Sequence, residues 1–355
     1  MNRILLLNKY GRWNENSRFL FYNYIQDLTK NGFSVVDFPL LGKKAEESFI
    51  KKDKVNSFVF ISSYLQRLFR VITYKYYDIL WLDSEILPFL PFGLESLLIP
   101  LNKKIILQFS DAKFYRYQKG FNFLKRFLLK NKIPYWISHA DKIIVTTPEL
   151  RDYTQNWNQE SFLIPPSINL EDYPNRKLKH RSNDSAKEFI IGWTGSKFTT
   201  RFLSILREPL KELKRVFPIK LILLGGDPHW ESPIPTDYMP YTPENERIFL
   251  EKIDIGLQPL PLTLRETGNH SIKILKYMAN FKPVISSPVG AANIFMRHSE
   301  NGFLAKTEDD WYLSLRLIFE DEGMRLEMGR KSAEIVENEF SGNRSSKRIY
   351  EIFKE

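Results

Sequence analysis

The stretch that decides the fold is DIGLQPLPLTLRETGNHSIKILKYMANFKPVISSPV, residues 254–289. An apolar run at 254–260 leads through a polar loop into a segment of helical periodicity at 271–280, and a second apolar run follows at 283–289. Apolar runs without alternation are typical of strands covered on both faces, and a helix between two such strands is the crossover of a parallel sheet. This stretch therefore predicts a strand–helix–strand unit of an α/β protein.

The same alternation continues on both sides of this stretch. Residues 169–187 (NLEDYPNRKLKHRSNDSAK) are polar and without periodicity, which predicts a linker. With 355 residues and roughly 150 residues per domain, we expect two doubly wound parallel-sheet domains, 1–168 and 188–340. The other strands are expected at 4–8, 34–38, 78–82, 104–109, 142–146, 161–164, 188–193 and 220–225, and the other helices at 17–30, 200–216, 243–252, 308–321, 323–339 and 343–353.

The composition restricts the chemistry. Lys and Arg number 52 against 42 Asp and Glu, and the net charge of +10 favours partners that carry phosphate. The chain has no cysteine, which excludes disulfides, thiolate nucleophiles and zinc–cysteine sites. Its five histidines lack metal-binding spacing, and we expect no metal. The dinucleotide GxGxxG, P-loop and GxSxG patterns are all absent.

No apolar run reaches the roughly 20 residues of a membrane-spanning helix, because prolines interrupt the most apolar stretch, 86–101. The apolar run near the N-terminus is not followed by a signal-peptide cleavage site. The segment that begins at Lys113 and ends at Trp136 contains seven Lys or Arg, eight aromatic residues and no acid. This composition suits an anionic membrane surface or single-stranded nucleic acid, and the alternative is a helix whose aromatic rings belong to the core. We expect a cytoplasmic protein, soluble or peripheral to the membrane.

Candidate binding residues follow the predicted strands, because ligands of open parallel sheets bind where the strands end. The loop at 261–270 leads into a helix whose first amides and dipole attract an anion, and Gly268 allows a phosphate to approach the backbone. Lys273, one turn into the helix, is placed to reach a diphosphate, and a solvated lysine face is the alternative. A turn at 195–197 and Asp111, after the strand at 104–109, are further candidates, although Asp111 is also a typical helix N-cap.

At these residues the second half resembles the C-terminal domain of GT-B glycosyltransferases, specifically family 4. The resemblance lies in IIGWTGS (190–196), LLGG (223–226), DIGLQPL (254–260), KILKYMANFKPVISSPVGAANI (273–294) and ENGFLAKTEDDW (300–311). The first half is similar in order, with YDILWLDSEILP (77–88), ADKIIVTTPEL (140–150) and IPPSINLEDY (164–173).

The resemblance implies two Rossmann-like domains that face each other across a cleft, with a final helix at 341–355 crossing back to the first domain. It implies hexosyl transfer with retention from a nucleotide sugar to a cell-surface glycan or a lipid-linked acceptor at the inner membrane face, without a cofactor or metal. The catalytic residues that it implies are Lys273, Glu266 and Asp111, and the donor-binding residues are Gly195, Ser196, Lys197, Gly268, Asn269, His270, Ser271, Ile272 and Lys276.

The chain departs from the family at two positions. The family often has two glutamates eight residues apart, where this sequence has Gly268 and Lys276. The carboxylate that would hold the donor ribose is therefore missing, and Glu266 is the candidate substitute for the other one. This departure leaves open a non-catalytic GT-B protein that binds a nucleotide or glycan, or that serves as a membrane-associated assembly partner. Nucleic-acid binding rests on charge alone.

Overall fold

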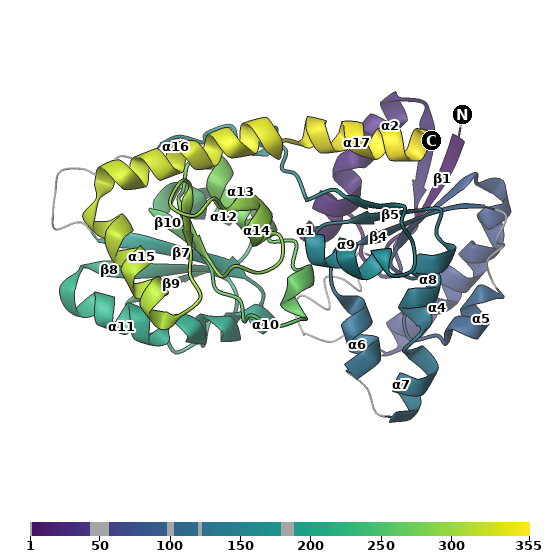
Figure 1. The fold of residues 1–355 in the computed structure, drawn as a ribbon, viewed down its shortest axis with the longest axis horizontal. Coiled ribbons are helices and arrows are strands. Elements are labelled where there is room, and N and C mark those ends of the chain that lie inside the picture. The colour runs from purple at the N-terminus through teal and green to yellow at the C-terminus, as the bar shows by residue number, and fades with distance from the viewer. Residues whose placement is uncertain (1, 43–56, 98–102, 120–122, 179–187) are drawn as a thin grey trace. The chain divides into compact units, whose positions relative to one another are not determined.

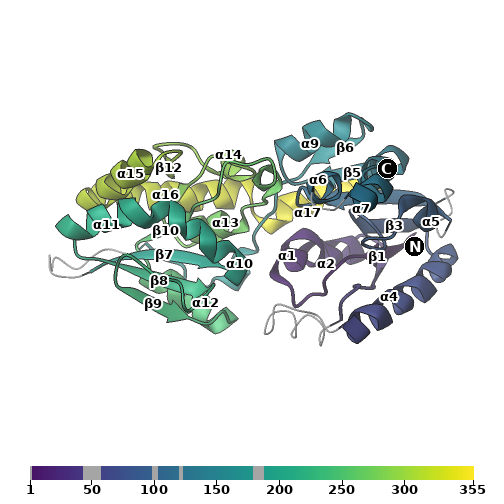
Figure 2. The same cartoon turned by 90° about the horizontal axis from the view of Figure 1, so that it is seen from below.

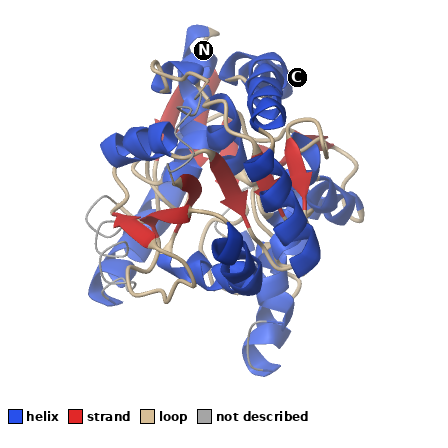
Figure 3. Cartoon of the chain, turned by 90° about the vertical axis from the view of Figure 1, so that its left-hand side faces the viewer, coloured by secondary structure: helices blue, strands red, loops and turns tan. Residues whose placement is uncertain are grey.

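In a computed structural model, the chain is described over residues 2–42, 57–97, 103–119, 123–178 and 188–355. It forms two compact units (Figure 1). Unit 1 comprises Met1–Pro166, Thr267–Asn269 and Gly342–Glu355, and unit 2 comprises Ser167–Glu266 and His270–Ser341. Both units contain strands together with helices, and helices lie around the strands (Figure 3). None of the described helices is both long and apolar enough to cross a bilayer.

Unit 1 is built on a six-stranded parallel sheet of order β2-β1-β3-β4-β5-β6. The strands are apolar because helices cover both of their faces. The strands are β1 (Asn2–Leu7), β2 (Phe33–Asp37), β3 (Ile79–Asp83), β4 (Lys104–Phe109), β5 (Lys142–Val145) and β6 (Ser161–Leu163). The helices are α1 (Glu15–Ser17), a π-helical turn (Arg18–Tyr22), α2 (Asn23–Lys30), α4 (Ser57–Ile72), a 3₁₀ turn (Thr73–Tyr76), α5 (Phe92–Ser96), α6 (Lys113–Lys119), α7 (Phe123–Leu129), α8 (Lys132–His139), α9 (Pro148–Gln155) and α17 (Gly342–Lys354).

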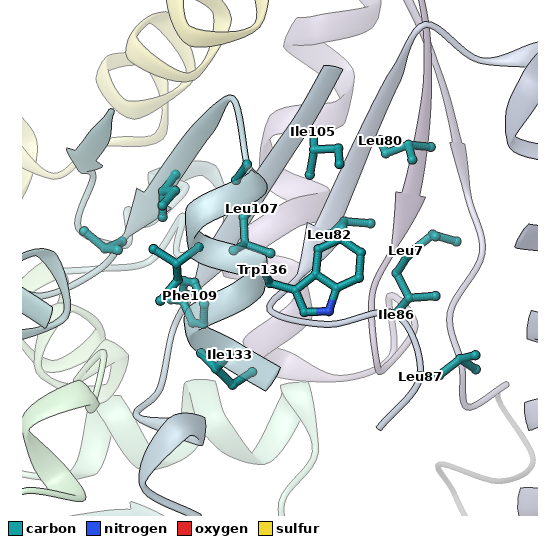
Figure 4. Packing of buried hydrophobic residues seen from close by; sticks show 14 of the residues in the cluster. Leu7, Leu80, Leu82, Ile86, Leu87, Ile105, Leu107, Phe109, Ile133 and Trp136 are labelled. Carbon is teal, nitrogen blue, oxygen red and sulfur yellow. The ribbon is translucent and has the colours of Figure 1, made fainter. Parts of the chain in front are cut away.

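Each face of this sheet has its own core. On one face Trp136 of α8 packs among the leucines of β3 and β4 (Figure 4). On the other face α17, which packs against α2, contributes Ile349, Ile352 and Phe353. The Phe353 ring meets the buried Trp81 ring edge to face, with 5.0 Å between the centroids. Helix α17, at the C-terminal end of the sequence, therefore completes the core to which β1 and α2 contribute near the N-terminus.

Unit 2 has a second six-stranded parallel sheet, of order β12-β11-β10-β7-β8-β9 (Figure 2). Helices α11 and α15 cover one face, and α12 and α13 pack on the other. The strands are β7 (Phe189–Gly195), β8 (Ile219–Gly225), β9 (Thr236–Met239), β10 (Ile255–Gln258), β11 (Val284–Ser286) and β12 (Gly302–Leu304). The helices are 3₁₀ turns at Leu170–Asp172 and Arg201–Leu206, and α10 (Lys197–Thr200), α11 (Arg207–Val216), α12 (Pro243–Lys252), α13 (Ile272–Ala279), α14 (Ala292–Phe295), α15 (Glu308–Glu320) and α16 (Glu322–Glu339). A further 3₁₀ turn, Glu266–Gly268, begins in unit 2 and has its last two residues in unit 1.

The predicted fold class, two Rossmann-like parallel-sheet domains, is confirmed. The helix predicted at 17–30 is instead broken by the π-helical turn, and the one predicted at 200–216 is divided into α10, a 3₁₀ turn and α11. Of the predicted linker, residues 179–187 lie outside the described part. Before them, Arg176 forms an ion pair of 2.8 Å with Glu337 of α16, so this stretch packs onto unit 2.

Candidate functional site

The candidate site in unit 2 is built on Trp193, a buried residue of β7. Two glycine turns pass directly over its indole. A Cβ atom on Gly195 would lie 2.4 Å from the ring, and one on Gly226, whose φ is +83°, would lie 2.8 Å from it. Both positions therefore require glycine, and the ends of β7 and β8 are held close together over one aromatic surface.

Hydrogen bonds fix the turn that follows Gly195. The Ser196 amide donates to Thr199 Oγ1 at 3.1 Å, and the hydroxyls of Thr199 and Thr200 donate back to the Ser196 carbonyl. The Asp227 amide donates to Thr200 Oγ1 at 2.9 Å, which ties this turn to the end of β8. The Ser196 amide is thus engaged within the turn, and the Lys197 side chain is exposed.

Helix α13 begins at the same edge of the sheet. Ser271 precedes the helix in the left-handed conformation, with φ +50°, and its hydroxyl accepts a hydrogen bond of 2.7 Å from Gln258 Nε2. Gln258 is buried at the end of β10, and its Oε1 has no hydrogen-bond partner within the described residues. The helix start therefore combines a positive dipole end with a buried amide that has unused hydrogen-bonding capacity.

His270 is neutral at this helix start. Burial and the nearby Lys273 lower the pKa of His270 to about 4. Its Nδ1 accepts a weak hydrogen bond of 3.4 Å from the Ile272 amide. His270 therefore shapes the loop without contributing positive charge at neutral pH.

Lys273 supplies the charge of the site. Its Nζ lies 4.9 Å from the centroid of the Trp193 ring, a cation–π contact that holds the half-buried side chain above the indole. Burial lowers the pKa of Lys273 to about 8, and Glu266 opposes this shift. An incoming anion would restore the ammonium fully, which makes this lysine responsive to a phosphate ligand.

Lys276 occupies a different environment from Lys273. It is buried and forms an ion pair with Glu246 of α12, and its Nζ lies 3.5 Å from the Tyr241 hydroxyl. The neighbouring Tyr277 hydroxyl accepts a hydrogen bond of 3.0 Å from the Thr194 amide. The alternative of a solvated lysine face is therefore wrong for Lys276.

The structure groups the predicted residues by unit. Glu266 is half-buried, 3.9 Å from the neighbouring guanidinium of Arg265. No group of three or more His, Asp or Glu side chains among the described residues is arranged to hold a metal ion. Unit 2 contains Gly195, Ser196, Lys197, Glu266, His270, Ser271, Ile272, Lys273 and Lys276, whereas Asp111, Gly268 and Asn269 belong to unit 1.

A buried polar cluster in unit 1 was missed by the sequence reasoning. Lys113 Nζ lies 2.6 Å from Asp83 Oδ1, and the Lys9 amide donates to the other Asp83 oxygen at 3.2 Å. The Arg67 guanidinium is buried beside them and donates to the Asn8 carbonyl; burial lowers its pKa to about 9. These five residues line a small cavity where β1 and β3 end.

A second ion pair extends this cluster. Lys132 is buried between Glu85, at 2.8 Å, and Glu95, at 3.1 Å, and the Tyr117 hydroxyl donates to Glu85. The available signal was the sequence LDSE at 82–85, where β3 ends, just as Asp111 comes shortly after the end of β4. The Asp111 side chain is exposed, and α6 begins two residues later, so Asp111 is not the N-cap of that helix.

Comparisons with known proteins agree with this architecture. No protein-family model matches the sequence, and no curated protein matches it. Among solved structures, sucrose-phosphate synthase from Thermosynechococcus elongatus matches with a TM-score of 0.70 at 15% identity, covering 100% of this chain and 98% of that one. The fold is that of the GT-B glycosyltransferases.

Two further GT-B structures match over their full length. Anabaena HepE, determined in complex with UDP-glucose, matches with a TM-score of 0.69 at 12% identity and covers 100% of both chains. WaaG, a glycosyltransferase involved in lipopolysaccharide biosynthesis, matches with a TM-score of 0.65 at 12% identity and covers 99% of both. At these identities the likeness is one of fold.

Proposed function

We propose that this protein transfers a hexose, with retention, from a nucleotide-sugar donor to a glycan or lipid-linked acceptor, without a resident metal. The observation that carries the proposal is Lys273, held above Trp193 at the start of α13 where β7, β8 and β10 end. The GT-B fold and the family 4 motifs support the same reaction.

The chemistry needs stabilisation of a leaving diphosphate. As the bond to the sugar breaks, negative charge grows on the diphosphate, and fixed positive groups lower the barrier. Lys273 and the dipole of α13 supply that charge without a metal ion. Glu266, whose charge acts on Lys273, is the candidate for contact with the donor sugar.

Unit 1 supplies the acceptor side in this proposal. Its cluster around Asp83 and Lys113 offers carboxylate and ammonium groups to acceptor hydroxyls. Asp111 lies near enough to this cluster for Lys113 and Asp83 to act on it electrostatically. We further propose that the protein works at the cytoplasmic membrane face, in contact with lipid through the exposed residues of the segment from Lys113 to Trp136.

The first experiment is binding. UDP, GDP, ADP and their glucose conjugates are added to the purified protein, and thermal unfolding is followed. A ligand at 100 times its dissociation constant stabilises its site by about 2.7 kcal/mol. We expect one nucleotide to raise the melting temperature.

Lys273→Ala should abolish that shift, whereas Lys214→Ala, which removes an exposed lysine of α11, should leave it unchanged. If no nucleotide stabilises the protein, or if Lys273→Ala binds as the wild type does, the donor site is assigned wrongly.

One observation favours a non-catalytic alternative. Lys276 occupies a position where the resemblance implies a carboxylate, and its ammonium forms a buried ion pair with Glu246. A protein that binds nucleotide sugar but neither transfers nor hydrolyses it, with any acceptor from a panel of glycans and lipid-linked sugars, would support this second function.

A further inference from the structure

Helix α4 of unit 1 presents an exposed apolar face. Its large apolar residues recur at intervals of three and four, which places them on one side of the helix. Each is between 51% and 78% exposed. These residues are Phe58, Ile61, Leu65, Phe69 and Ile72.

The opposite side of α4 is packed into the unit. Val71 and Arg67 are buried, and Leu68 packs against the core. The Tyr64 hydroxyl donates to the Pro88 carbonyl at 3.0 Å. The helix is thus anchored by one side, and its apolar stripe is a second face that the core does not use.

Helix α7 exposes a similar set of side chains. Phe123, Leu124, Phe127 and Leu128 are each between 49% and 74% exposed. Three cations, Lys125, Arg126 and Lys130, lie exposed among them or next to them. By contrast, Tyr117 of α6 and Trp136 of α8 are buried in the core. The predicted membrane-contact segment therefore divides into core helices and one exposed helix.

The loop after β3 connects these two helices. Pro88 accepts from Tyr64 of α4, and the next amide, that of Phe89, donates to the Tyr117 hydroxyl of α6 at 3.3 Å. Helix α6 packs in turn against α7. Phe89 itself is 41% exposed, so the connecting loop also carries an apolar side chain to the surface.

The charge of these segments selects the partner. Neither segment contains an acid, at 57–76 or at 113–136. Arg67 and Lys132 are buried, whereas Lys75 beyond α4 and Lys125, Arg126 and Lys130 of the α7 region are exposed. Exposed apolar side chains bordered by cations fit the interface of a bilayer, where apolar groups enter the acyl boundary and cations meet anionic headgroups. Association of two copies through this face would instead bring like charges together.

We propose that α4 and α7 together form a membrane-binding surface, the α4–α7 surface, for bilayers that contain anionic glycerophospholipid. This deepens the proposed function, because it names the surface on which a lipid-linked acceptor is met and adds α4, which the sequence segment did not include. The binding itself requires no sugar donor, and its test is therefore separate from the test of transfer.

The test is sedimentation of the full chain with vesicles of phosphatidylcholine alone, or with about 30% phosphatidylglycerol. The variants are the stripe variant (Phe58→Ser, Leu65→Ser and Phe69→Ser), the charge variant (Lys125→Ser, Arg126→Ser and Lys130→Ser), and a control, Leu313→Ser with Leu317→Ser. The control removes two exposed leucines of α15 in unit 2.

We expect the wild type and the control to bind anionic vesicles about tenfold more strongly than neutral ones. The stripe variant should lose about tenfold or more of its binding to anionic vesicles, and the charge variant should lose the preference for anionic lipid. Circular dichroism and nucleotide binding should be unchanged in each variant, because the substituted side chains are exposed.

Three results would overturn the proposal. The wild type could fail to bind either vesicle, or the stripe variant could bind as the wild type does. In the third, light scattering without lipid would show a dimer that the stripe substitutions convert to a monomer, which would assign the face to a second copy. None of these results changes the assignment of the donor site, which the nucleotide experiment tests separately.

Discussion

At the scale of single residues, Lys273 combines two opposing requirements. Its contact with Trp193 and its partial burial hold the side chain in place, but burial also favours the neutral amine. Only the protonated form attracts a diphosphate. The affinity for the ligand must therefore depend on pH in a range set by this lysine.

We expect nucleotide affinity to be full below about pH 8 and to fall as pH rises above it, by up to tenfold per pH unit, because the free protein loses the Lys273 proton there and the complex keeps it. Calorimetric titration with UDP-glucose from about pH 7 to about pH 9.5 measures this slope. Lys273→Arg, which stays charged throughout, should bind with little dependence on pH. A wild-type curve as flat as that of the arginine variant would show that Lys273 does not contact the ligand.

The buried pair of Lys276 and Glu246 yields a stability prediction. Lys276→Met leaves the Glu246 carboxylate buried without a counter-charge and should lower the free energy of unfolding of unit 2 by about 3–5 kcal/mol. The double variant Lys276→Met with Glu246→Leu should recover most of that loss, because both charges leave together. Urea denaturation followed by circular dichroism measures both effects.

The matched control for this prediction is an exposed pair on α15. Arg316 lies 2.9 Å from Glu320, and both side chains are more than 40% exposed. Arg316→Ala should cost less than about 1 kcal/mol. A cost for Lys276→Met as small as this would mean that the buried pair contributes no more than a surface pair.

At the scale of elements, the proposed donor site depends on how closely two turns approach one indole. Trp193 belongs to β7, and the turns after β7 and β8 cross it at Gly195 and Gly226. Each turn is local in sequence, but Trp193 contacts both turns and also Lys273 of α13, so the indole joins three separate segments. A substitution at one of these glycines should therefore change both the conformation of the turn and the affinity for the ligand.

Gly195→Ala tests this dependence. The added methyl group must displace the indole or the turn, which should cost about 1–3 kcal/mol of stability and weaken nucleotide binding. Gly42→Ala is the control, since a Cβ there meets no atom within 4 Å. Thermal unfolding and calorimetric titration of both variants decide the matter. Equal behaviour of the two variants would contradict the close approach.

The same scale explains what the sequence could predict. The strands from β1 to β8 have continuous apolar runs, and the loop from β10 into α13 is contiguous in sequence. These strands and this loop could therefore be predicted from the sequence. The short strands β9 and β12 were missed, because β9 is a polar edge strand of four residues and β12 has only three. The cluster around Asp83 was missed because β1, α4 and α6 bring its members together from distant positions.

At the scale of the whole molecule, two cores are built from one chain whose ends meet in unit 1. Helix α17 inserts Ile349, Ile352 and Phe353 into the core formed by β1, β3 and α2. The ion pair of 2.6 Å between the buried Lys142 and the exposed Glu355 adds a contact near the chain end. The stability of unit 1 should therefore be sensitive to changes at the C-terminal residues of α17, whereas the proposed donor site, built on Trp193 and Lys273 of unit 2, should not be.

Phe353→Ala should lower the stability of unit 1 by about 3–5 kcal/mol, because it empties a buried aromatic site against Trp81. Nucleotide affinity should be unchanged, because Trp193 and Lys273, on which the proposed donor site is built, belong to unit 2. Lys354→Ala, the exposed neighbour on the same helix, should alter neither quantity. Denaturation and calorimetric titration provide the two measurements. A loss of nucleotide affinity in Phe353→Ala would show that the donor site depends on this core.

The position of α17 also sets an order of events on the ribosome. The strands of unit 1 emerge first, but their hydrophobic core lacks its closing helix until all of unit 2 has been translated. At ~5–20 residues per second, that delay is on the order of ten seconds or more. During that interval the side chains of β1, β3 and α2 that α17 will cover are accessible to chaperones. Unit 1 is therefore the first unit to begin translation and the last to complete its core.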